Sequence, residues 1–184
     1  MNDFLKDIDS SWCLFLDRDG VINRRIYGGY VSSWKEFEFL PEVKNALRIF
    51  SGVFKYIFII TNQQGIGKGL MSETNLAQIH SNMISEIELA GGRITKIYHC
   101  PDLAQKPDNC RKPSPFMAQK AKVDFPVIDF QKSIMIGDSK SDILFGKNSN
   151  MYTVLQKTSE DVNITANMKI NNLLEFAKML NVNV

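Results

Sequence analysis

Two aspartates, Asp17 and Asp19, stand one residue apart directly after the short apolar run 12–16. A run of this length suits a buried strand rather than a helix, and open α/β sheets bind their ligands at the carboxyl ends of strands. Carboxylates held so close repel each other unless a cation lies between them, and hard oxygen ligands suit Mg²⁺. The pattern therefore predicts a metal-assisted site at the end of a strand.

Three later strand candidates also end in polar groups. The ends carry hydroxyl, amide, basic and acidic side chains: Thr61 and Asn62 after the run 56–60, Arg111 and Lys112 in the loop after 94–98, and Asp138 and Asp142 after 133–136. Because parallel strands end at the same edge of a sheet, we expect these groups to converge on one crevice.

This set of side chains suits phosphoryl transfer. Asp17 can attack phosphorus to form an aspartyl-phosphate, and Lys112 together with Mg²⁺ would offset the repulsion between carboxylate and phosphate. Asp19 could protonate the leaving alkoxide and then activate the water that cleaves the intermediate. Thr61 is expected to form a hydrogen bond to a phosphoryl oxygen, and Asp138 is expected to complete the metal site. Asp142 is expected to orient the metal's waters or Lys112 without contacting the metal directly.

Strand and helix patterns alternate along the chain. Helical patterns cover about 41–52, 76–89, 116–123, 143–147 and 171–180, and a last strand covers 152–155. This alternation is typical of a parallel sheet with helices on both faces. Residues 36–40 could form a small hairpin arm, and the intervals between Asp17, Thr61 and Lys112 leave no room for a large cap domain. We expect one α/β domain over 1–184, with its core at about 12–157 and a closing helix at 171–180.

The composition disfavours several classes of partner. The 184 residues carry a formal net charge of +2 with no block of like charges, which argues against nucleic acid. No run is apolar enough to span a membrane, and residues 1–11 lack the features of a signal peptide. The chain has three cysteines, and Cys13 lies in the expected core. A disulfide is therefore not expected, and a reducing cytoplasm fits. No apolar stripe predicts a large interface, so we expect a monomer.

The segments Asp17–Asn23, Thr61-Asn62-Gln63, Lys112 and Gly137-Asp138…Asp142 resemble the four ordered motifs of the haloacid dehalogenase (HAD) superfamily of phosphohydrolases. The stretches 61–69 and 110–113 are similar to the branch of D-glycero-D-manno-heptose 1,7-bisphosphate phosphatases and histidinol-phosphate phosphatases. The resemblance covers about 14–155 and implies a three-layer α/β/α Rossmann-like fold, with Asp17 as nucleophile and Asp19 as general acid/base. It also implies Mg²⁺ ligation by Asp17, the Asp19 backbone carbonyl and Asp138, phosphoryl contacts from Thr61 and Lys112, and substrate contacts from Gly29, Tyr30, Asn62, Gln63, Gln64 and Arg111.

One loop departs from these relatives, which commonly hold a structural zinc with a Cys-x-His pair and a Cys-x-Cys pair. Here the loop reads Cys100-Pro101-Asp102 and Asp108-Asn109-Cys110, and His99 stands on the wrong side of Cys100. Zinc held by Cys100, Cys110, Asp102 and Asp108 is chemically possible, but structural sites favour thiolate and imidazole ligands. We therefore expect no structural zinc and a loop that holds its shape by packing.

The substrate stays open at this point. A phosphorylated sugar, above all heptose 1,7-bisphosphate, suits an uncapped site in which Arg111 can bind a second phosphate. The same motifs permit histidinol phosphate. A catalytically silent domain that binds a phospho-ligand is the alternative from a different class, and the presence of both Asp17 and Asp19 speaks against it.

Three other features have less specific interpretations. His80 is expected to be solvated. The glycines at 65, 67 and 69 are expected to form a tight turn rather than a nucleotide cradle. Tyr27, Tyr30 and Trp34 either line the substrate edge or cover the hairpin.

Overall fold

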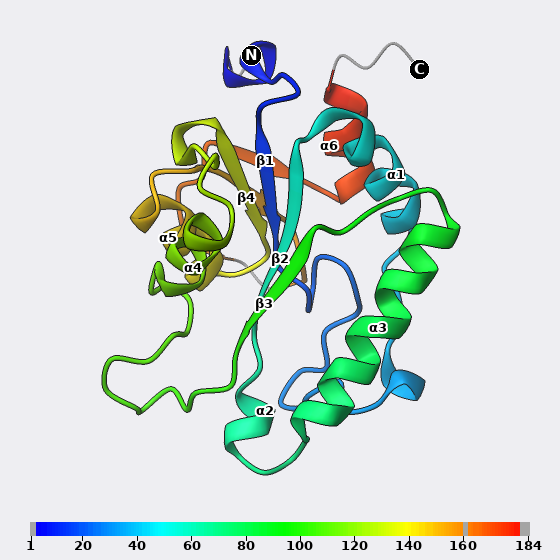
Figure 1. Cartoon of the computed structure of the whole chain (residues 1–184), viewed down its shortest axis with the longest axis vertical. Coiled ribbons are helices and arrows are strands. Elements are labelled where there is room, and N and C mark those ends of the chain that lie inside the picture. Colours follow the sequence, from blue (N-terminus) through cyan, green and yellow to red (C-terminus); the bar gives the residue numbers. More distant parts are fainter. Residues whose placement is uncertain (1–2, 160–161, 181–184) are drawn as a thin grey trace.

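The computed structural model describes residues 3–159 and 162–180. Within these residues the strands form a sheet of order β3-β2-β1-β4-β5-β6 in which every neighbouring pair is parallel (Figure 1). The strands are β1 (Cys13–Leu16), β2 (Tyr56–Asn62), β3 (Lys96–Cys100), β4 (Ser133–Gly137), β5 (Tyr152–Gln156) and β6 (Met168–Ile170). The helices are α1 (Val43–Val53), α2 (Gln64–Gly67), α3 (Glu73–Leu89), α4 (Phe116–Asp124), α5 (Lys140–Asn148) and α6 (Leu173–Met179).

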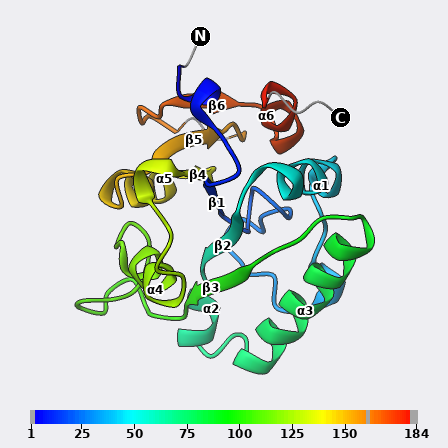
Figure 2. The same ribbon diagram turned by 45° about the horizontal axis from the view of Figure 1, so that its top comes forward.

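Both faces of the sheet are covered by helices, which confirms the three-layer α/β/α prediction (Figure 2). Leu14 and Leu16 of β1 belong to a core shared with α1, α3 and α6. The alternate residues Cys13 and Phe15 belong to a second core shared with α4 and α5. All four side chains are buried because both faces of the strand are covered, and this explains why the sequence of β1 is apolar throughout.

The intervals predicted to lack a cap domain contain a few helices, strands and loops, and the structure describes all of their residues. Between Asp17 and Thr61 lie a 3₁₀ turn at Trp34–Glu36, α1 and β2, and between Thr61 and Lys112 lie α2, α3, β3 and a loop. The expected hairpin arm is reduced to one antiparallel bridge between Asn23 and Phe39. No described helix combines the length and the hydropathy needed to cross a bilayer.

Two elements differ from the expectations. The strand β6 lies in a stretch in which no strand was predicted, and its three residues pair with β5. The helix α5 begins at Lys140 rather than at 143, because Ser139 and Asp142 form a reciprocal cap at its start. This cap places the helix start directly after β4, at the carboxyl edge of the sheet.

Candidate active site

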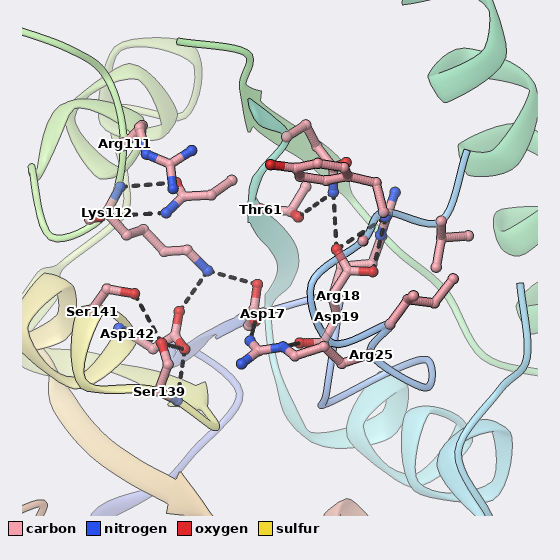
Figure 3. A pocket seen from close by; sticks show the side chains of 16 residues that line it. Asp17, Arg18, Asp19, Arg25, Thr61, Arg111, Lys112, Ser139, Ser141 and Asp142 are labelled. Atoms are coloured by element: carbon pink, nitrogen blue, oxygen red, sulfur yellow. Dashed lines mark hydrogen bonds and ion pairs between the residues drawn. The ribbon is translucent and has the colours of Figure 1, made fainter. Parts of the chain in front are cut away.

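The polar strand ends converge on one cleft of about 290 Å³ at the carboxyl edge of the sheet, beside β1 (Figure 3). Side chains from four separate regions of the chain line it, as predicted from the parallel strand order. The lining residues are Asp17, Arg18, Asp19, Arg25, Ile26, Gly29, Tyr30, Val31, Thr61, Asn62, Gln63, Arg111, Lys112, Ser139, Ser141 and Asp142.

At the centre, the buried ammonium group of Lys112 lies between two buried carboxylates. Its Nζ is 2.6 Å from Asp17 Oδ1 and 2.5 Å from Asp142 Oδ1, and it donates to the Ile60 carbonyl at 2.8 Å. Burial alone would lower the pKa of Lys112, but the charges of Asp142 and Asp17 outweigh it and raise that pKa. Lys112 therefore stays positively charged beside Asp17, which is where a phosphate dianion would need neutralisation.

Asp19 is held by a ring of donors. Arg18 donates to both of its carboxylate oxygens at 2.9 and 3.0 Å, Asn23 donates to Oδ1 at 3.0 Å, and Gln63 donates to Oδ2 at 3.0 Å. Burial would raise the pKa of Asp19, but the Arg18 charge and these hydrogen bonds lower it below its usual range. Asp19 is thus ionised and fixed in orientation while the cleft holds no substrate.

His80 of α3 contradicts the expectation that it is solvated. It is 9% exposed, and its Nε2 lies 3.2 Å from Arg18 Nη1. Burial and the neighbouring Arg18 charge lower the pKa of His80 to about 3, so it stays neutral and can accept a hydrogen bond from the guanidinium. This contact could not be predicted from the sequence, because the two residues are far apart in the chain and meet only when α3 packs on the sheet.

Gln63 connects Asp19 to Thr61. The Gln63 amide donates to Thr61 Oγ1 at 2.8 Å, and both side chains are buried. Because the Thr61 oxygen accepts this bond, its own hydroxyl proton is left to donate elsewhere in the cleft. The resemblance implied substrate contact for Gln63, whereas its amide is bound to these two neighbours.

Asn62 is similarly occupied with the protein itself. Its Oδ1 accepts from the Lys112 backbone N–H at 2.9 Å, and its Nδ2 donates to the Lys112 carbonyl at 3.3 Å. This reciprocal pair ties the end of β2 to the loop that carries Arg111 and Lys112. Arg111 lines the cleft beside Lys112 and donates to the Asp102 carbonyl at 3.4 Å.

That loop is closed by a disulfide between Cys100 and Cys110, which corrects two expectations: that the chain forms no disulfide, and that packing shapes the loop. The Cα atoms are 5.6 Å apart, within the reach of a disulfide. Asp102 also accepts from the Cys110 N–H at 3.1 Å. Sγ and carboxylate atoms of Cys100, Asp102 and Cys110 lie within 4.8 Å of one another, and Asp108 is not part of this group.

The loop after β1 supplies the remaining predicted substrate contacts. Gly29 and Tyr30 line the cleft, and the Tyr30 ring packs against Gly65, where an added Cβ would lie 3.0 Å from the ring. Lys68 Nζ lies 5.5 Å from the centre of the same ring. Gln64, at the start of α2, is half-buried and is not among the described residues that line the cleft.

The other two aromatic residues of this region lie elsewhere. Tyr27 is 56% exposed, and Trp34 stacks on Phe37 with ring centres 4.9 Å apart. Each of the two open interpretations therefore holds for one residue. Tyr30 lines the cleft, and Trp34 covers the arm.

An acidic cluster has the donor set that a hard divalent cation requires: Asp17 and Asp142 line the cleft, whereas Asp138 lines the neighbouring cavity. Oxygens of Asp17, Asp138 and Asp142 lie within 4.8 Å of one another. Burial and the nearby Asp17 charge raise the pKa of Asp138 to about 8, and burial and the nearby Asp142 charge raise the pKa of Asp17 to about 6. Asp138 Oδ2 is buried without a hydrogen-bond partner among the described residues. A divalent cation fits these oxygens, because it would relieve their repulsion and satisfy the unpartnered atom.

Gly20 makes room for Asp138 and cannot be replaced without strain. Its φ is +102°, and an added Cβ would lie 1.9 Å from Asp138 Oδ2. Arg25, from the loop after β1, approaches the same carboxylate: its Nη2 is 2.7 Å from Asp138 Oδ1.

Sequence reasoning missed four polar cleft residues, Arg18, Arg25, Ser139 and Ser141, and two apolar ones, Ile26 and Val31. The Ser139-x-x-Asp142 spacing is a capping signature that could have placed Ser139 at the cleft edge. The two arginines have no local signal, because their partners lie on other segments.

Comparison with known proteins relates the chain to phosphatases. A HAD-hydrolase-like family model matches residues 109–167. The D-glycero-alpha-D-manno-heptose-1,7-bisphosphate 7-phosphatase of Mycobacterium tuberculosis is 40% identical over 74% of this chain and 72% of its own length. The enzyme of the same name from Campylobacter jejuni is 40% identical over 80% of this chain and 83% of its own length. The structure of a D,D-heptose 1,7-bisphosphate phosphatase from B. bronchiseptica, complexed with magnesium and phosphate, has a TM-score of 0.83 and 25% identity, covering 92% of this chain and 97% of that one.

Proposed function

Because the chain belongs to the phosphatases of the HAD superfamily, we propose that it removes the C7 phosphate of a heptose 1,7-bisphosphate with Mg²⁺ and a phosphorylated Asp17. The observation that carries the proposal is the cleft itself: Asp17, Asp19, Thr61 and Lys112 meet there beside an acidic cluster suited to Mg²⁺. The proposed substrate, and the phosphate ester bond at C7 that is cleaved, follow from the names of the relatives.

In the first step, an Asp17 carboxylate oxygen attacks the phosphorus and the bond to the sugar oxygen breaks. The Lys112 ammonium group, whose Nζ lies 2.6 Å from Asp17 Oδ1, neutralises the phosphoryl oxygens. The Thr61 hydroxyl donates a hydrogen bond to one of these oxygens. The leaving sugar oxygen takes a proton from Asp19. Approach of the phosphate dianion favours that proton on Asp19, because a nearby negative charge raises the pKa of a carboxyl group.

In the second step, Asp19 accepts a proton from water, and the water oxygen attacks the phosphorus of phospho-Asp17. The bond between Asp17 and phosphorus breaks, inorganic phosphate leaves, and Asp17 is restored as a carboxylate. The Arg18 guanidinium favours this step because it stabilises the ionised form of Asp19 that acts as the base.

Asp17 and Asp138 of the acidic cluster would hold Mg²⁺, together with the Asp19 backbone carbonyl that the resemblance implies. When bound there, the ion offsets the charge of the transferring phosphoryl group. Asp142 instead pairs with Lys112 and holds it beside Asp17. Arg111, the residue before Lys112, lines the cleft and would bind the second phosphate of the sugar.

The test is phosphate release with Mg²⁺ from heptose 1,7-bisphosphate, histidinol phosphate and several sugar monophosphates, for the natural protein and for Arg111→Met. We expect the bisphosphate to give the highest kcat/KM and Arg111→Met to raise its KM far more than that of histidinol phosphate. Equal or better turnover of histidinol phosphate, unaffected by Arg111→Met, would replace the proposed substrate. No turnover of any substrate would favour a domain that only binds a phospho-ligand.

A further inference from the structure

The Arg25 guanidinium contacts the same three groups that are proposed to hold Mg²⁺. Its Nη2 lies 2.7 Å from Asp138 Oδ1 and 3.7 Å from Asp17 Oδ2, and its Nε donates to the Asp19 backbone carbonyl at 3.1 Å. The side chain reaches these oxygens from the loop after β1, and Figure 3 shows it beneath Asp17 and Asp19. A guanidinium and a divalent cation compete for this position, because both approach the same three groups and two positive charges so close together repel each other.

We propose that Arg25 is an exchange residue for the metal site: its guanidinium and Mg²⁺ compete for the oxygens of Asp17, Asp19 and Asp138, and binding of the ion displaces the arginine. The inference rests on the proposed Mg²⁺ site. It adds that the affinity for the ion is set by an internal competitor as well as by the ligands.

The charges of the site explain why such a competitor is useful. Asp17, Asp138 and Asp142 are all buried, and the neighbouring Lys112 can offset only part of their negative charge. Arg25 supplies a second cation at the carboxylate that Lys112 does not contact. Three carboxylates can therefore stay close together, in position for the ion, without depending on it to hold them there.

The surroundings of Arg25 leave room for it to move. Its side chain is 29% exposed. It forms part of the wall of the catalytic cleft and also of a neighbouring cavity of about 410 Å³, which Val21, Tyr27 and Leu40 help to line. The guanidinium can leave the carboxylates for either space without unfolding the loop that carries it.

The adjacent Arg24 provides a matched control. It carries the same charge one residue earlier, but it is 68% exposed and its guanidinium pairs with Glu38 at 3.0 Å, away from the carboxylates. Replacing either arginine by glutamine removes one positive charge from the same loop, and only the Arg25 replacement removes the competitor.

The test is calorimetric titration of Mg²⁺ into the substrate-free protein at two salt concentrations. We expect Arg25→Gln to lower the Kd for Mg²⁺ by about tenfold, the factor that applies when the competitor fills the site in roughly nine molecules of ten. Arg24→Gln should leave Kd nearly unchanged. An equal or weaker affinity of Arg25→Gln would overturn the inference and leave the proposed function intact, whereas absence of Mg²⁺ binding in both the natural protein and Arg25→Gln would overturn both.

A second measurement follows Arg25 directly in the natural chain, with a conservative variant used only to assign its signal. In a spectrum of ¹⁵N-labelled arginine side chains, the Arg25 Nε–H signal, identified by its loss in Arg25→Lys, should shift as Mg²⁺ is added and saturate at the concentration found by calorimetry. An Arg25 signal that stays in place while the metal site fills would show that the two cations do not exchange.

Discussion

Replacement of Asn62 by alanine distinguishes an anchoring role from a substrate contact. The resemblance to known phosphatases implies that Asn62 touches the substrate, whereas in the structure its amide is bound on both sides to the backbone of Lys112. If the anchor is its role, the variant should lose stability even when no substrate is present.

The magnitude follows from the two hydrogen bonds. Each is worth about 0.5–1.5 kcal/mol, so their joint loss costs about 2 kcal/mol of unfolding free energy. For a protein of this size, about 1 kcal/mol corresponds to roughly 2–4 °C in Tm, so we expect Asn62→Ala to lower Tm by about 4–8 °C. Because the loop also positions Arg111 and Lys112, kcat/KM should fall by about a hundredfold.

The assays are thermal and urea unfolding without substrate, followed by steady-state kinetics on the heptose bisphosphate. Gln64→Ala is the matched comparison, since Gln64 was predicted to contact the substrate as well and is half-buried at the start of α2. Its unfolding free energy should change by no more than about 0.5 kcal/mol. An Asn62→Ala variant with unchanged stability and only a raised KM would refute the anchoring role.

Three further predictions concern the acidic cluster and its neighbours. Folding raises the pKa of Asp17 from 3.8 to about 6 and that of Asp138 from 3.8 to about 8. The native state therefore binds more protons than the unfolded chain, and these two groups should make the unfolding free energy fall as pH rises from about 4 to 8. Urea unfolding in a chelator should show this fall, Mg²⁺ should reduce it, and a rise over that range would contradict the assignment. Gly20→Ala should weaken Mg²⁺ binding about tenfold or more in calorimetry, because its Cβ would displace Asp138 Oδ2, and an unchanged Kd would be the opposing result. Arg18→Met should lower the unfolding free energy by about 3 kcal/mol, because it leaves the partly buried Asp19 without its ion pair, and urea unfolding that changes by less than about 1 kcal/mol would argue against that pair.

The central strands and the catalytic cluster could be predicted because their signals are local. β1, β2 and β4 are apolar runs covered on both faces, and each ends in a polar group at a point visible in the sequence. Once the strands are known to be parallel, their ends must meet, so Asp17, Thr61 and Asp138 could be brought together without coordinates.

What the sequence could not supply are contacts between segments far apart in the chain. His80 meets Arg18 only because α3 covers one face of the sheet, and Arg25 reaches Asp138 across 113 residues of sequence. The strand β6 has three residues, too few for a periodic pattern, and it forms because β5 offers an edge. The pairing of Cys100 with Cys110 likewise depends on how the intervening loop folds back.

The most direct test of the account is capture of the phosphorylated enzyme. The natural protein would be mixed with Mg²⁺ and heptose bisphosphate labelled with ³²P at C7, quenched in acid within milliseconds, and digested to locate the label. We expect hydroxylamine-sensitive label on the peptide that contains Asp17, and neither label nor turnover in Asp17→Asn. Turnover that persists in Asp17→Asn, with no label on the natural protein, would contradict nucleophilic attack by Asp17.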